Sequence, residues 1–185
     1  EINVITVEDP VEYRIPGINQ VQVNVKAGLT FASALRSILR SDPDVVLIGE
    51  IRDQETAQIA IEASLTGHLV LSTLHTNDAP SAVTRLIEMD IEPFLVGSAL
   101  DCVVAQRLAR RLCEKCKQPY HANPEELQAM GFGFDPRMGV PTLFRPIGCQ
   151  HCSNTGYRGR MALHEVMSVS EDIERLAVSR ASSAE

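Results

Sequence analysis

The sequence predicts an α/β fold with a mostly parallel sheet, to which a small cysteine-rich segment is attached. Short apolar runs alternate with segments of helical periodicity between residues 1 and 112, which is the pattern of a layered α/β domain. The chain has 185 residues, of which 44% are apolar, and this is enough to bury a core. At Cys113 the composition changes to a loop-rich stretch with two C-x-x-C pairs. We therefore expect three parts, at residues 1–112, 113–157 and 158–185.

The strands of the predicted sheet are short runs of aliphatic and β-branched residues. We expect them at residues 2–7, 20–25, 45–48 and 68–74, with a turn at Pro16–Gly17 between the first two. The run Val45–Ile48 is wholly apolar, which favours a central strand. Beyond the cysteines, a further strand is expected at about residues 160–166.

Helices are expected where apolar residues recur every three or four positions. Thr30 is a suitable N-cap for a helix over residues 31–40. Asp53 is suited to cap the next helix, which Gly67 should end. A further helix is expected to start at Asn77 or Asp78, with Pro80 in its first turn, and to run to about Met89. Others are expected at about residues 93–112, 124–130 and after Ser170. Cys102 would lie inside one of them and is interpreted as a small buried apolar residue.

Composition narrows the classes of function. The formal net charge is −7, whereas a general nucleic-acid binder has a broadly basic surface. Aromatic residues make up 4% of the chain, which is too few to suggest stacking platforms for single strands. No apolar run approaches the ~18–20 residues that a membrane-spanning helix needs. The chain does not begin with methionine and its first residues already resemble a strand, so we expect a piece of a longer protein.

Polar side chains follow three of the predicted strands. They are Glu8, Asp9 and Glu12 after the first strand, Glu50 after Val45–Ile48, and Thr73, His75 and Asn77 at the end of the strand 68–74. The carboxyl ends of parallel strands meet at one edge of a sheet, where ligands bind. An acid in this position holds Mg²⁺ or orients a water molecule in phosphoryl-transfer enzymes. Neutral hydroxyl, imidazole and amide groups beside it are suited to sensing a terminal phosphate.

Each of these groups has an ordinary structural interpretation when it is taken alone. Glu50 could begin a surface loop, the acids after the first strand could be solvated, and a single histidine is more often a hydrogen-bonded structural residue. Arg36 and Arg40 are four residues apart on one helix, so they could form a solvated face. Three polar strand ends in one parallel sheet are harder to explain by accident, because they would line one edge together.

The two C-x-x-C pairs predict a metal site. They are formed by Cys113, Cys116, Cys149 and Cys152. Four thiolates in this arrangement hold zinc tetrahedrally and leave no position for water, so the zinc would be structural. Disulfides and a redox-active pair are the alternatives, although four spaced cysteines suit a metal better than a redox pair. His151, between the last two cysteines, could compete as a ligand.

Three strings of residues, together with the four cysteines, resemble the secretion ATPases. The string EDPVE at residues 8–12 looks like the Asp box, DPDVVLIGEIRD at 42–53 like the Walker B box, and TGHLVLSTLHTN at 66–77 like the His box. The combination is similar to the assembly ATPases of type II secretion and type IV pili, over about residues 1–175. The retraction ATPases of the same superfamily lack the four-cysteine element.

The resemblance implies a RecA-like P-loop NTPase fold that works as a homohexamer, with ATP and Mg²⁺ between subunits. It implies that Glu50 is the Walker B acid, that Glu8 and Glu12 are Asp-box acids near the metal and the γ-phosphate, and that His75, with Thr73 in the same string, contacts the γ-phosphate. Arg36, Arg40, Arg52 and Arg85 match positions where such enzymes keep arginines that reach ATP or an adjoining subunit.

One motif of that family is missing. A P-loop needs G-x-x-x-x-G-K-[ST], and none of the three lysines, Lys26, Lys115 and Lys117, follows a glycine. In the family this loop precedes the Asp box. We therefore expect the chain to be the C-terminal part of a motor ATPase and to hydrolyse no ATP by itself.

By resemblance, the parent protein powers type IV pilus assembly at the cytoplasmic face of the inner membrane. Its expected partner is an inner-membrane platform protein, through which it would associate with the membrane peripherally; no nucleic-acid partner is expected. The sequence does not separate this function from that of a type II secretion ATPase. A zinc-ribbon binding module without ATPase activity is a further alternative, but it predicts a basic surface, and residues 117–148 hold few positive charges.

Overall fold

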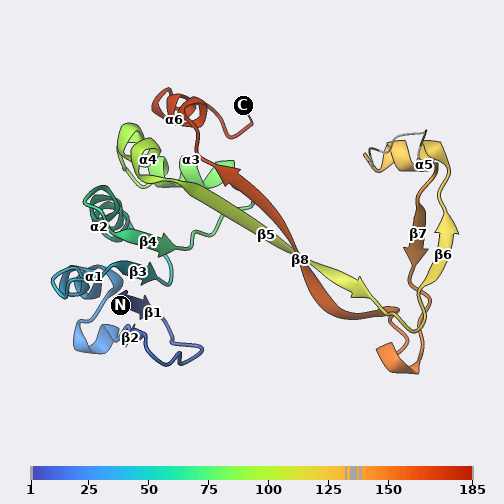
Figure 1. Ribbon diagram of the computed structural model, residues 1–185, viewed down its shortest axis with the longest axis horizontal. Helices are drawn as coiled ribbons and strands as arrows, with labels where there is room; N and C mark the ends of the chain where they lie inside the picture. The colour runs from blue at the N-terminus through green and yellow to red at the C-terminus, as the bar shows by residue number, and fades with distance from the viewer. Residues whose placement is uncertain (1, 132, 134–136, 138, 185) are drawn as a thin grey trace. The chain divides into compact units, whose positions relative to one another are not determined.

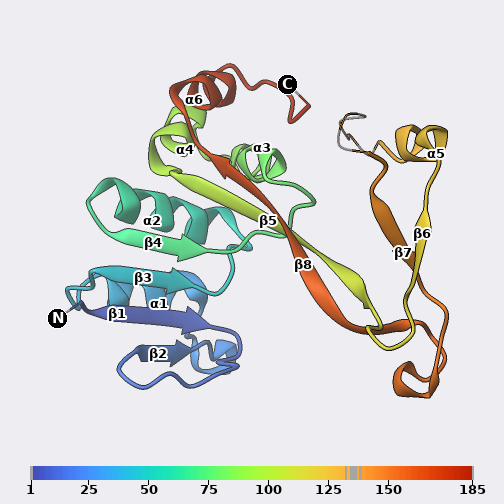
Figure 2. The ribbon, with the colours of Figure 1, turned by 45° about the vertical axis from the view of Figure 1, so that its right-hand side comes forward.

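The computed structural model describes residues 2–131, 133, 137 and 139–184. The chain divides into two compact units, one formed by Glu1–Ala105 with Glu165–Glu185 and the other by Gln106–His164. Figures 1 and 2 show the helices and strands of both.

The first unit is built on a four-stranded parallel sheet in the order β2–β1–β3–β4. Its strands are β1 (Val4–Glu8), β2 (Asn19–Gln22), β3 (Val45–Ile48) and β4 (Leu69–Ser72). The register pairs Val7 with Ile48 and Ile48 with Ser72, so β1, β3 and β4 end together at one edge (Figure 2). The α/β class with a mostly parallel sheet, predicted from the sequence, is confirmed.

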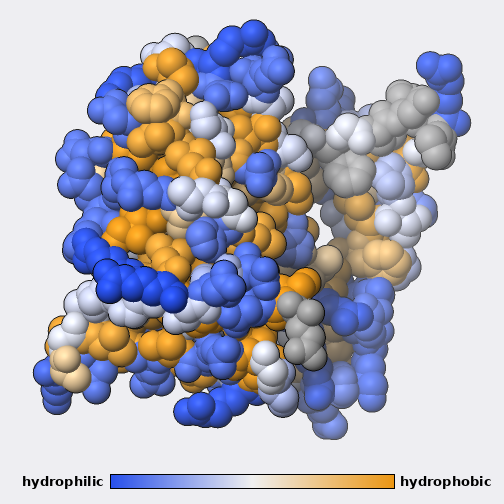
Figure 3. Space-filling view, turned by 60° about the vertical axis from the view of Figure 1, so that its left-hand side comes forward, coloured by the Kyte–Doolittle hydropathy of each residue, from blue (hydrophilic) through white to orange (hydrophobic). Residues whose placement is uncertain are grey.

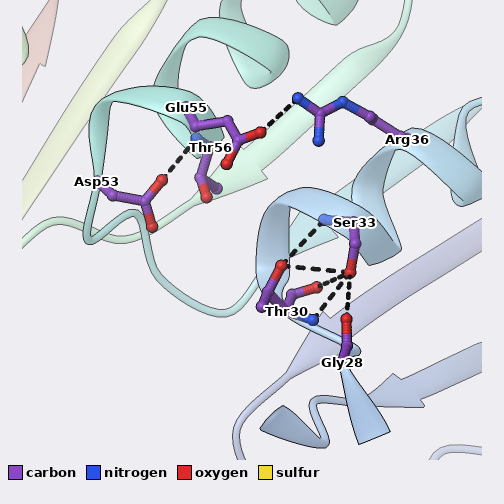
Figure 4. A network of polar contacts seen from close by, with 7 residues as sticks. All are labelled: Gly28, Thr30, Ser33, Arg36, Asp53, Glu55 and Thr56. Atoms are coloured by element: carbon purple, nitrogen blue, oxygen red, sulfur yellow. Dashed lines mark hydrogen bonds and ion pairs between the residues drawn. The ribbon is translucent and has the colours of Figure 1, made fainter.

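Two helices, α1 (Phe31–Ile38) and α2 (Gln54–Leu65), cover one face of this sheet (Figure 2). Both N-caps are the predicted ones, as Figure 4 shows: Thr30 accepts a hydrogen bond from the Ser33 amide, and Asp53 accepts one of 2.8 Å from the Thr56 amide. The core lies between the helices and the strands and includes Leu35, Val46 and Ile48, all 0% exposed. These side chains therefore fix which face of the sheet is buried.

The other face of the sheet is less covered. Leu47 is half-buried, whereas Leu69 and Leu71 of the outer strand β4 are 53% and 47% exposed. Parallel sheets are normally covered on both faces, so this face is unusual. Other hydrophobic side chains also reach the surface, as Figure 3 shows for the side of the first unit that carries α1 and α2.

The rest of the first unit consists of α3 (Pro80–Glu88), α4 (Pro93–Ala99) and α6 (Glu171–Val178). Helices α4 and α6 pack closely, because a Cβ atom at Gly97 would lie 2.6 Å from Cγ of Glu174. Ser98 Oγ also donates a hydrogen bond of 3.2 Å to the Glu174 carboxylate. Ser170 caps α6, as the sequence predicted. Among the described residues, no helix is both long and apolar enough to cross a lipid bilayer.

One predicted helix is wrong. Residues 93–112 do not form a single helix: α4 ends at Ala99, and the strand β5 (Cys102–Leu112) follows. Leu100 takes an extended conformation, and β5 then pairs with β8 (Tyr157–Ser168), which runs in the opposite direction (Figure 1). This pairing outweighs the local helical periodicity. Cys102, interpreted from the sequence as buried in a helix, is an exposed residue of β5.

The second unit is loop-rich, as its composition indicated. Strands β6 (Gln118–His121) and β7 (Thr142–Arg145) pair antiparallel. The short helix α5 (Pro124–Ala129) follows β6 and is capped by Asn123, which accepts a hydrogen bond of 2.6 Å from the Glu126 amide.

The packing of α1 predicts a large loss of stability when its central leucine is shortened. Leu35 is 0% exposed, so Leu35→Ala leaves a cavity, and we expect a loss of about 2–5 kcal/mol in the free energy of unfolding. Leu65, which is 44% exposed at the end of α2, is the matched control, and Leu65→Ala should have a much smaller effect. Urea unfolding followed by far-ultraviolet circular dichroism measures both. Equal midpoints for the two variants would contradict the core described above.

Candidate functional site

Glu50 lies just beyond β3 and contacts two other side chains from the same edge of the sheet. Arg52 Nη2 donates a hydrogen bond of 2.6 Å to Oε1 of Glu50, and His75 Nε2 lies 3.2 Å from Oε2. The Glu50 side chain is 18% exposed, whereas that of His75 is 87% exposed. The structure therefore brings together two of the predicted catalytic residues, with one predicted arginine beside them.

The backbone explains why these side chains meet. Gly49 donates from its amide to Val7 O at 2.8 Å, and a Cβ atom there would lie 3.3 Å from Cα of Glu8. Thr73 Oγ1 donates to Gly49 O at 2.7 Å, and the Ile51 amide donates to Thr73 O at 3.0 Å. These bonds extend the pairing of strand ends beyond the sheet itself. Thr73, predicted to bind nucleotide, thus joins the segments that carry Glu50 and His75.

The charge of Glu50 is set by its neighbours. The hydrogen bond from Arg52 lowers the pKa of Glu50; desolvation acts against this shift, and His75 adds to it. The same hydrogen bond raises the pKa of Arg52. Glu50 is therefore an ionised carboxylate at neutral pH, able to accept hydrogen bonds from water.

Arg52 also links Glu50 to the segment after β1. Its Nη1 lies 3.3 Å from Oδ2 of Asp9, and its guanidinium lies 5.8 Å from the ring centre of Phe31. Asp9 belongs to the acidic string EDPVE, but sequence reasoning selected its two glutamates instead. The signal that could have found Asp9 is the short distance between strand ends in a parallel sheet, which places an arginine after β3 beside an acid after β1.

Glu8 lies at the end of β1, and its carboxylate is held from the β2 side. Thr6 Oγ1 and Gln20 Nε2 donate to the same oxygen, Oε1, at 2.5 Å and 3.0 Å. Gln20 also accepts from the Ile15 amide at 2.8 Å and donates to Tyr13 O at 2.9 Å, so it orders the loop after β1. Neither Thr6 nor Gln20 was selected from the sequence: Thr6 is a neighbour of Glu8 on β1 itself, whereas the contact of Gln20 depends on the pairing of β1 with β2.

The remaining predicted residues lie apart from Glu50. Glu12 is exposed on the loop after β1. Arg36 of α1 pairs with Glu55 of α2 at 2.5 Å (Figure 4), and Arg40 is exposed just after α1. Within the described residues, then, this group is not brought into contact with Glu50 or His75.

Arg85 of α3 takes an intermediate position. It pairs with Glu88 at 3.3 Å, but it also lines a cavity of about 350 Å³. The other lining residues are Ile51, Arg52, Leu74, His75 and Met89. Three apolar and three basic side chains therefore line the cavity, and the basic groups suit an anionic ligand or an acidic side chain.

The four predicted metal ligands cluster in the second unit. The Sγ atoms of Cys113, Cys116, Cys149 and Cys152 all lie within 4.8 Å of one another. Three of the separations are 3.9, 3.8 and 3.8 Å. Sulfurs about 2.3 Å from a zinc ion at the corners of a tetrahedron are about 3.8 Å apart, so the cluster fits zinc. The separations are far longer than a disulfide bond, and all five cysteines are free thiols.

The surroundings of the cluster shift the pKa values of two of its thiols in opposite directions. Desolvation acts to raise the pKa of Cys152, but amide donors from Cys149 and Gly156 outweigh it and lower that pKa to about 6. Desolvation raises the pKa of Cys116 to about 11. Bound zinc would supply the positive charge that keeps the whole set deprotonated. His151 is not part of the cluster: its ring is exposed and lies 2.8 Å from Arg158 Nη1.

Two glycines allow the cysteine loops to fold tightly. Gly148 has φ +108°, and a Cβ atom there would lie 2.7 Å from Asn154 O. Gly156 has φ +76°, and a Cβ atom there would lie 2.5 Å from Cβ of Pro146. Both positions favour glycine on conformational and steric grounds.

Comparisons with known proteins agree on one family. The family model described as "Type II/IV secretion system protein" matches residues 1–185. The chain is 54% identical over 183 residues to the type IV pilus assembly ATPase PilB of Thermus thermophilus, covering 99% of this chain and 20% of that protein. It is 55% identical over 171 residues to the putative type II secretion system protein E of Escherichia coli, covering 92% of this chain and 34% of that protein. The chain thus spans between a fifth and a third of the length of these relatives.

Solved structures show the same fold. The crystal structure of the pilus retraction motor PilT with bound ADP matches with a TM-score of 0.66 and 26% identity, covering 96% of this chain and 42% of that one. The VirB11 ATPase from the Brucella suis type IV secretion system, solved with sulphate, matches with a TM-score of 0.51 and 28% identity, over 57% of this chain and 35% of that one.

Zinc content tests the cysteine cluster. We expect about one zinc ion per chain, and we expect Cys149→Ser to lose it because one ligand of a closed tetrahedron is missing. Cys102→Ser is the matched control, since Cys102 is exposed on β5 and lies outside the cluster. Metal analysis of the purified proteins measures both. Equal zinc in Cys149→Ser and in the unaltered chain would rule out this site.

A titration tests the pairing of Glu50 with Arg52. We expect Arg52→Ala to raise the pKa of Glu50 towards the ordinary value of about 4.3. Arg85→Ala should leave that pKa unchanged, because Arg85 pairs with Glu88. Carboxyl-detected NMR across acidic pH measures the shift.

The direction of the pKa shift of Glu50 also determines how the Glu50–Arg52 pair affects the stability of the fold as the pH changes. The pKa of Glu50 is lower in the folded chain, so the pair stabilises the fold above the unfolded-state pKa of about 4.3. This contribution is lost as the pH falls through the folded-state pKa. A Glu50 pKa that is the same with and without Arg52 would contradict the assignment.

Proposed function

We propose a function from one premise: the chain belongs to the type II/IV secretion system protein family. Its relatives include a type IV pilus assembly ATPase and type II secretion proteins. We infer that this chain is the C-terminal part of a motor ATPase that hydrolyses ATP to power type IV pilus assembly. The observation that supports this best is the contact of Glu50 with Arg52 and His75 at the carboxyl edge of the parallel sheet.

In this proposal Glu50 orients the attacking water. The carboxylate is kept ionised by Arg52, and it is partly exposed, so it can accept a hydrogen bond from a water molecule. His75, which touches the same carboxylate and is largely exposed, can report the presence or loss of a terminal phosphate to Glu50. Electrostatic stabilisation and positioning of this kind carry most of phosphoryl-transfer catalysis.

The acids near Glu50 are suited to a metal-bound nucleotide. Mg²⁺, when bound with ATP, neutralises charge that develops on the phosphates. Both hydrogen bonds to Glu8 from the described residues reach Oε1, which leaves Oε2 for the metal or its water. Glu12 on the exposed loop would contribute from the same side. Thr73 would act through its link to Gly49.

The arginines fall into two groups in this proposal. Arg52 and Arg85 line the cavity beside His75, so they would contact the nucleotide or an acidic group brought to it. Arg36 on the exposed side of α1 and Arg40 just after this helix would contact an adjoining subunit of a homohexamer. An arginine that reaches a neighbouring active site can raise the rate by roughly 10³–10⁵.

The open face of the sheet is consistent with a missing P-loop segment. Leu69 and Leu71 are exposed on β4, at the edge of a parallel sheet that should be covered on both faces. We infer that a preceding segment of the parent protein covers these leucines and supplies the G-x-x-x-x-G-K-[ST] loop. Without that segment the bound nucleotide has no phosphate cradle.

The four-cysteine element of residues 113–157 has a different role in this proposal. Its closed set of thiolates suits structural zinc, so the element would serve as a rigid contact rather than as a catalyst. We infer that it contacts a platform protein of the inner membrane. The parent would then lie at the cytoplasmic face, associated with the membrane through its partners.

A second candidate is supported by one observation. The identity to type II secretion proteins, 55% for that of Vibrio cholerae, is as high as the identity to the pilus assembly ATPase. The type II secretion ATPase is therefore the alternative parent, with the same chemistry at Glu50. A zinc-ribbon module without ATPase motifs is not retained, because the family match extends over residues 1–185.

Phosphate release tests the proposed chemistry. We expect this chain alone to release no phosphate from Mg·ATP, and the full-length parent to turn ATP over. In the parent, Glu50→Gln should lower kcat by about 10²-fold or more and leave ATP binding intact, because a neutral amide no longer orients the water. Glu62→Gln, a change in an exposed acid of α2 that accepts a hydrogen bond from Gln58, is the control. Turnover by the Glu50→Gln parent at the unaltered rate would refute the role of Glu50.

A further inference from the structure

Glu165 of β8 reaches the segment that begins α3. The Ala79 amide donates a hydrogen bond of 2.7 Å to Oε2 of Glu165, across 86 positions of sequence. Ala79 is 0% exposed, so its amide has no access to solvent water and needs an internal acceptor. The next residue, Pro80, has no N–H, and the Ser81 amide donates to Asp78 Oδ1 at 2.8 Å. Two carboxylates therefore satisfy the start of α3, and one of them comes from a distant strand.

The segment held by Glu165 also carries His75. Between His75 and Ala79 the chain is closed on itself: the Thr76 amide donates to Leu74 O at 3.1 Å, and Thr76 Oγ1 donates to Asp78 O at 3.1 Å. Residues 74–79 therefore form a compact turn rather than a free loop. One end of this turn is fixed by β4, and the other is fixed by the hydrogen bond to Glu165.

The hydrogen bond from the Ala79 amide to Glu165 also lies at the start of α3. This helix carries Arg85, which lines the same cavity as His75. A helix start that is stabilised by a carboxylate is favoured by the helix dipole. Arg85 is also held by the buried Ala82 and Leu86 of α3, so loss of the Glu165 contact should act mainly on the turn that carries His75.

Glu165 is itself well placed to act as an anchor. The strand β8 pairs with β5, and the Val169 amide donates to Asp101 O at 2.9 Å just beyond it. Helix α6 follows and packs against α4 through Glu174 and Gly97. The carboxylate thus projects from a strand that is held by its pairing with β5 and by the packing of α6 on α4.

We propose that Glu165 is a positioning residue, which holds His75 against Glu50 through the Ala79 amide. It does not touch the nucleotide; it sets the position of a residue that does. The catalytic part of this inference rests on the proposed function, but the placement of His75 does not. None of the sequence motifs includes Glu165, because its partner is an amide that carries no pattern of its own.

NMR on this chain tests the placement directly. We expect Glu165→Ala to speed hydrogen exchange of the Ala79 amide by about tenfold, the effect of one lost hydrogen bond. The His75 ring nitrogen resonances should move towards those of a free imidazole. Glu165→Gln should preserve both signals, because the amide oxygen of glutamine still accepts from Ala79. Glu171→Ala removes an exposed acid at the start of α6, away from the packing of α6 on α4, and it should leave both signals unchanged.

Two outcomes would overturn the proposal. Unaltered Ala79 exchange in Glu165→Ala would show that the hydrogen bond is absent. Faster Ala79 exchange with unaltered His75 resonances would show that Glu165 only stabilises α3. If Glu165→Ala does not fold, Glu165→Asp replaces it: its side chain is one methylene shorter and should lose the same contact.

Kinetics of the full-length parent test the catalytic consequence. We expect Glu165→Ala to lower kcat for ATP hydrolysis by about tenfold with little change in KM, and Glu165→Gln to restore most of the rate. An unchanged kcat, or a change confined to KM, would overturn the positioning role. A parent without any ATPase activity would instead refute the proposed function, and the NMR result would still decide the placement of His75.

Discussion

The parallel pairing of β3 with β1 on one side and β4 on the other is the constraint on which the candidate site depends. Because the three strands run in one direction and are in register, their carboxyl ends leave the sheet side by side. Arg52 then contacts both Glu50 after β3 and Asp9 after β1, and Glu50 also contacts His75 after β4. An antiparallel arrangement of the same strands would place these groups at opposite edges.

Much of this arrangement could be predicted from the sequence because it depends on local pattern. The wholly apolar run Val45–Ile48 is a strand with the predicted bounds, and Thr30 and Asp53 cap the predicted helices. The cysteine cluster was predictable from spacing alone. The segment 93–112 was predicted wrongly, because its local periodicity suits a helix and its pairing with β8 depends on residues more than forty positions away.

The supporting contacts of the site could not be predicted for the same reason. Gln20 holds Glu8, and Glu165 holds the turn after His75, through hydrogen bonds that join different elements. In the contact made by Glu165 the partner is a backbone amide, and because every residue except proline carries one, the sequence does not single it out. Local sequence patterns therefore identify the candidate catalytic groups, whereas the groups that position them become visible only when the strands are paired.

The four cysteines have to be understood as part of the second unit's core. Among its described residues, the buried apolar side chains are Cys113, Ala122, Leu127 and Cys152, so half of them are thiols of the cluster. A core of one alanine and one leucine cannot offset the conformational entropy of such a loop-rich segment. Zinc binding contributes about 10–16 kcal/mol in small zinc-dependent peptides, which is ample to order the loops around it. In the proposed function, zinc-bound thiolates would therefore take the place of a hydrophobic core in this unit.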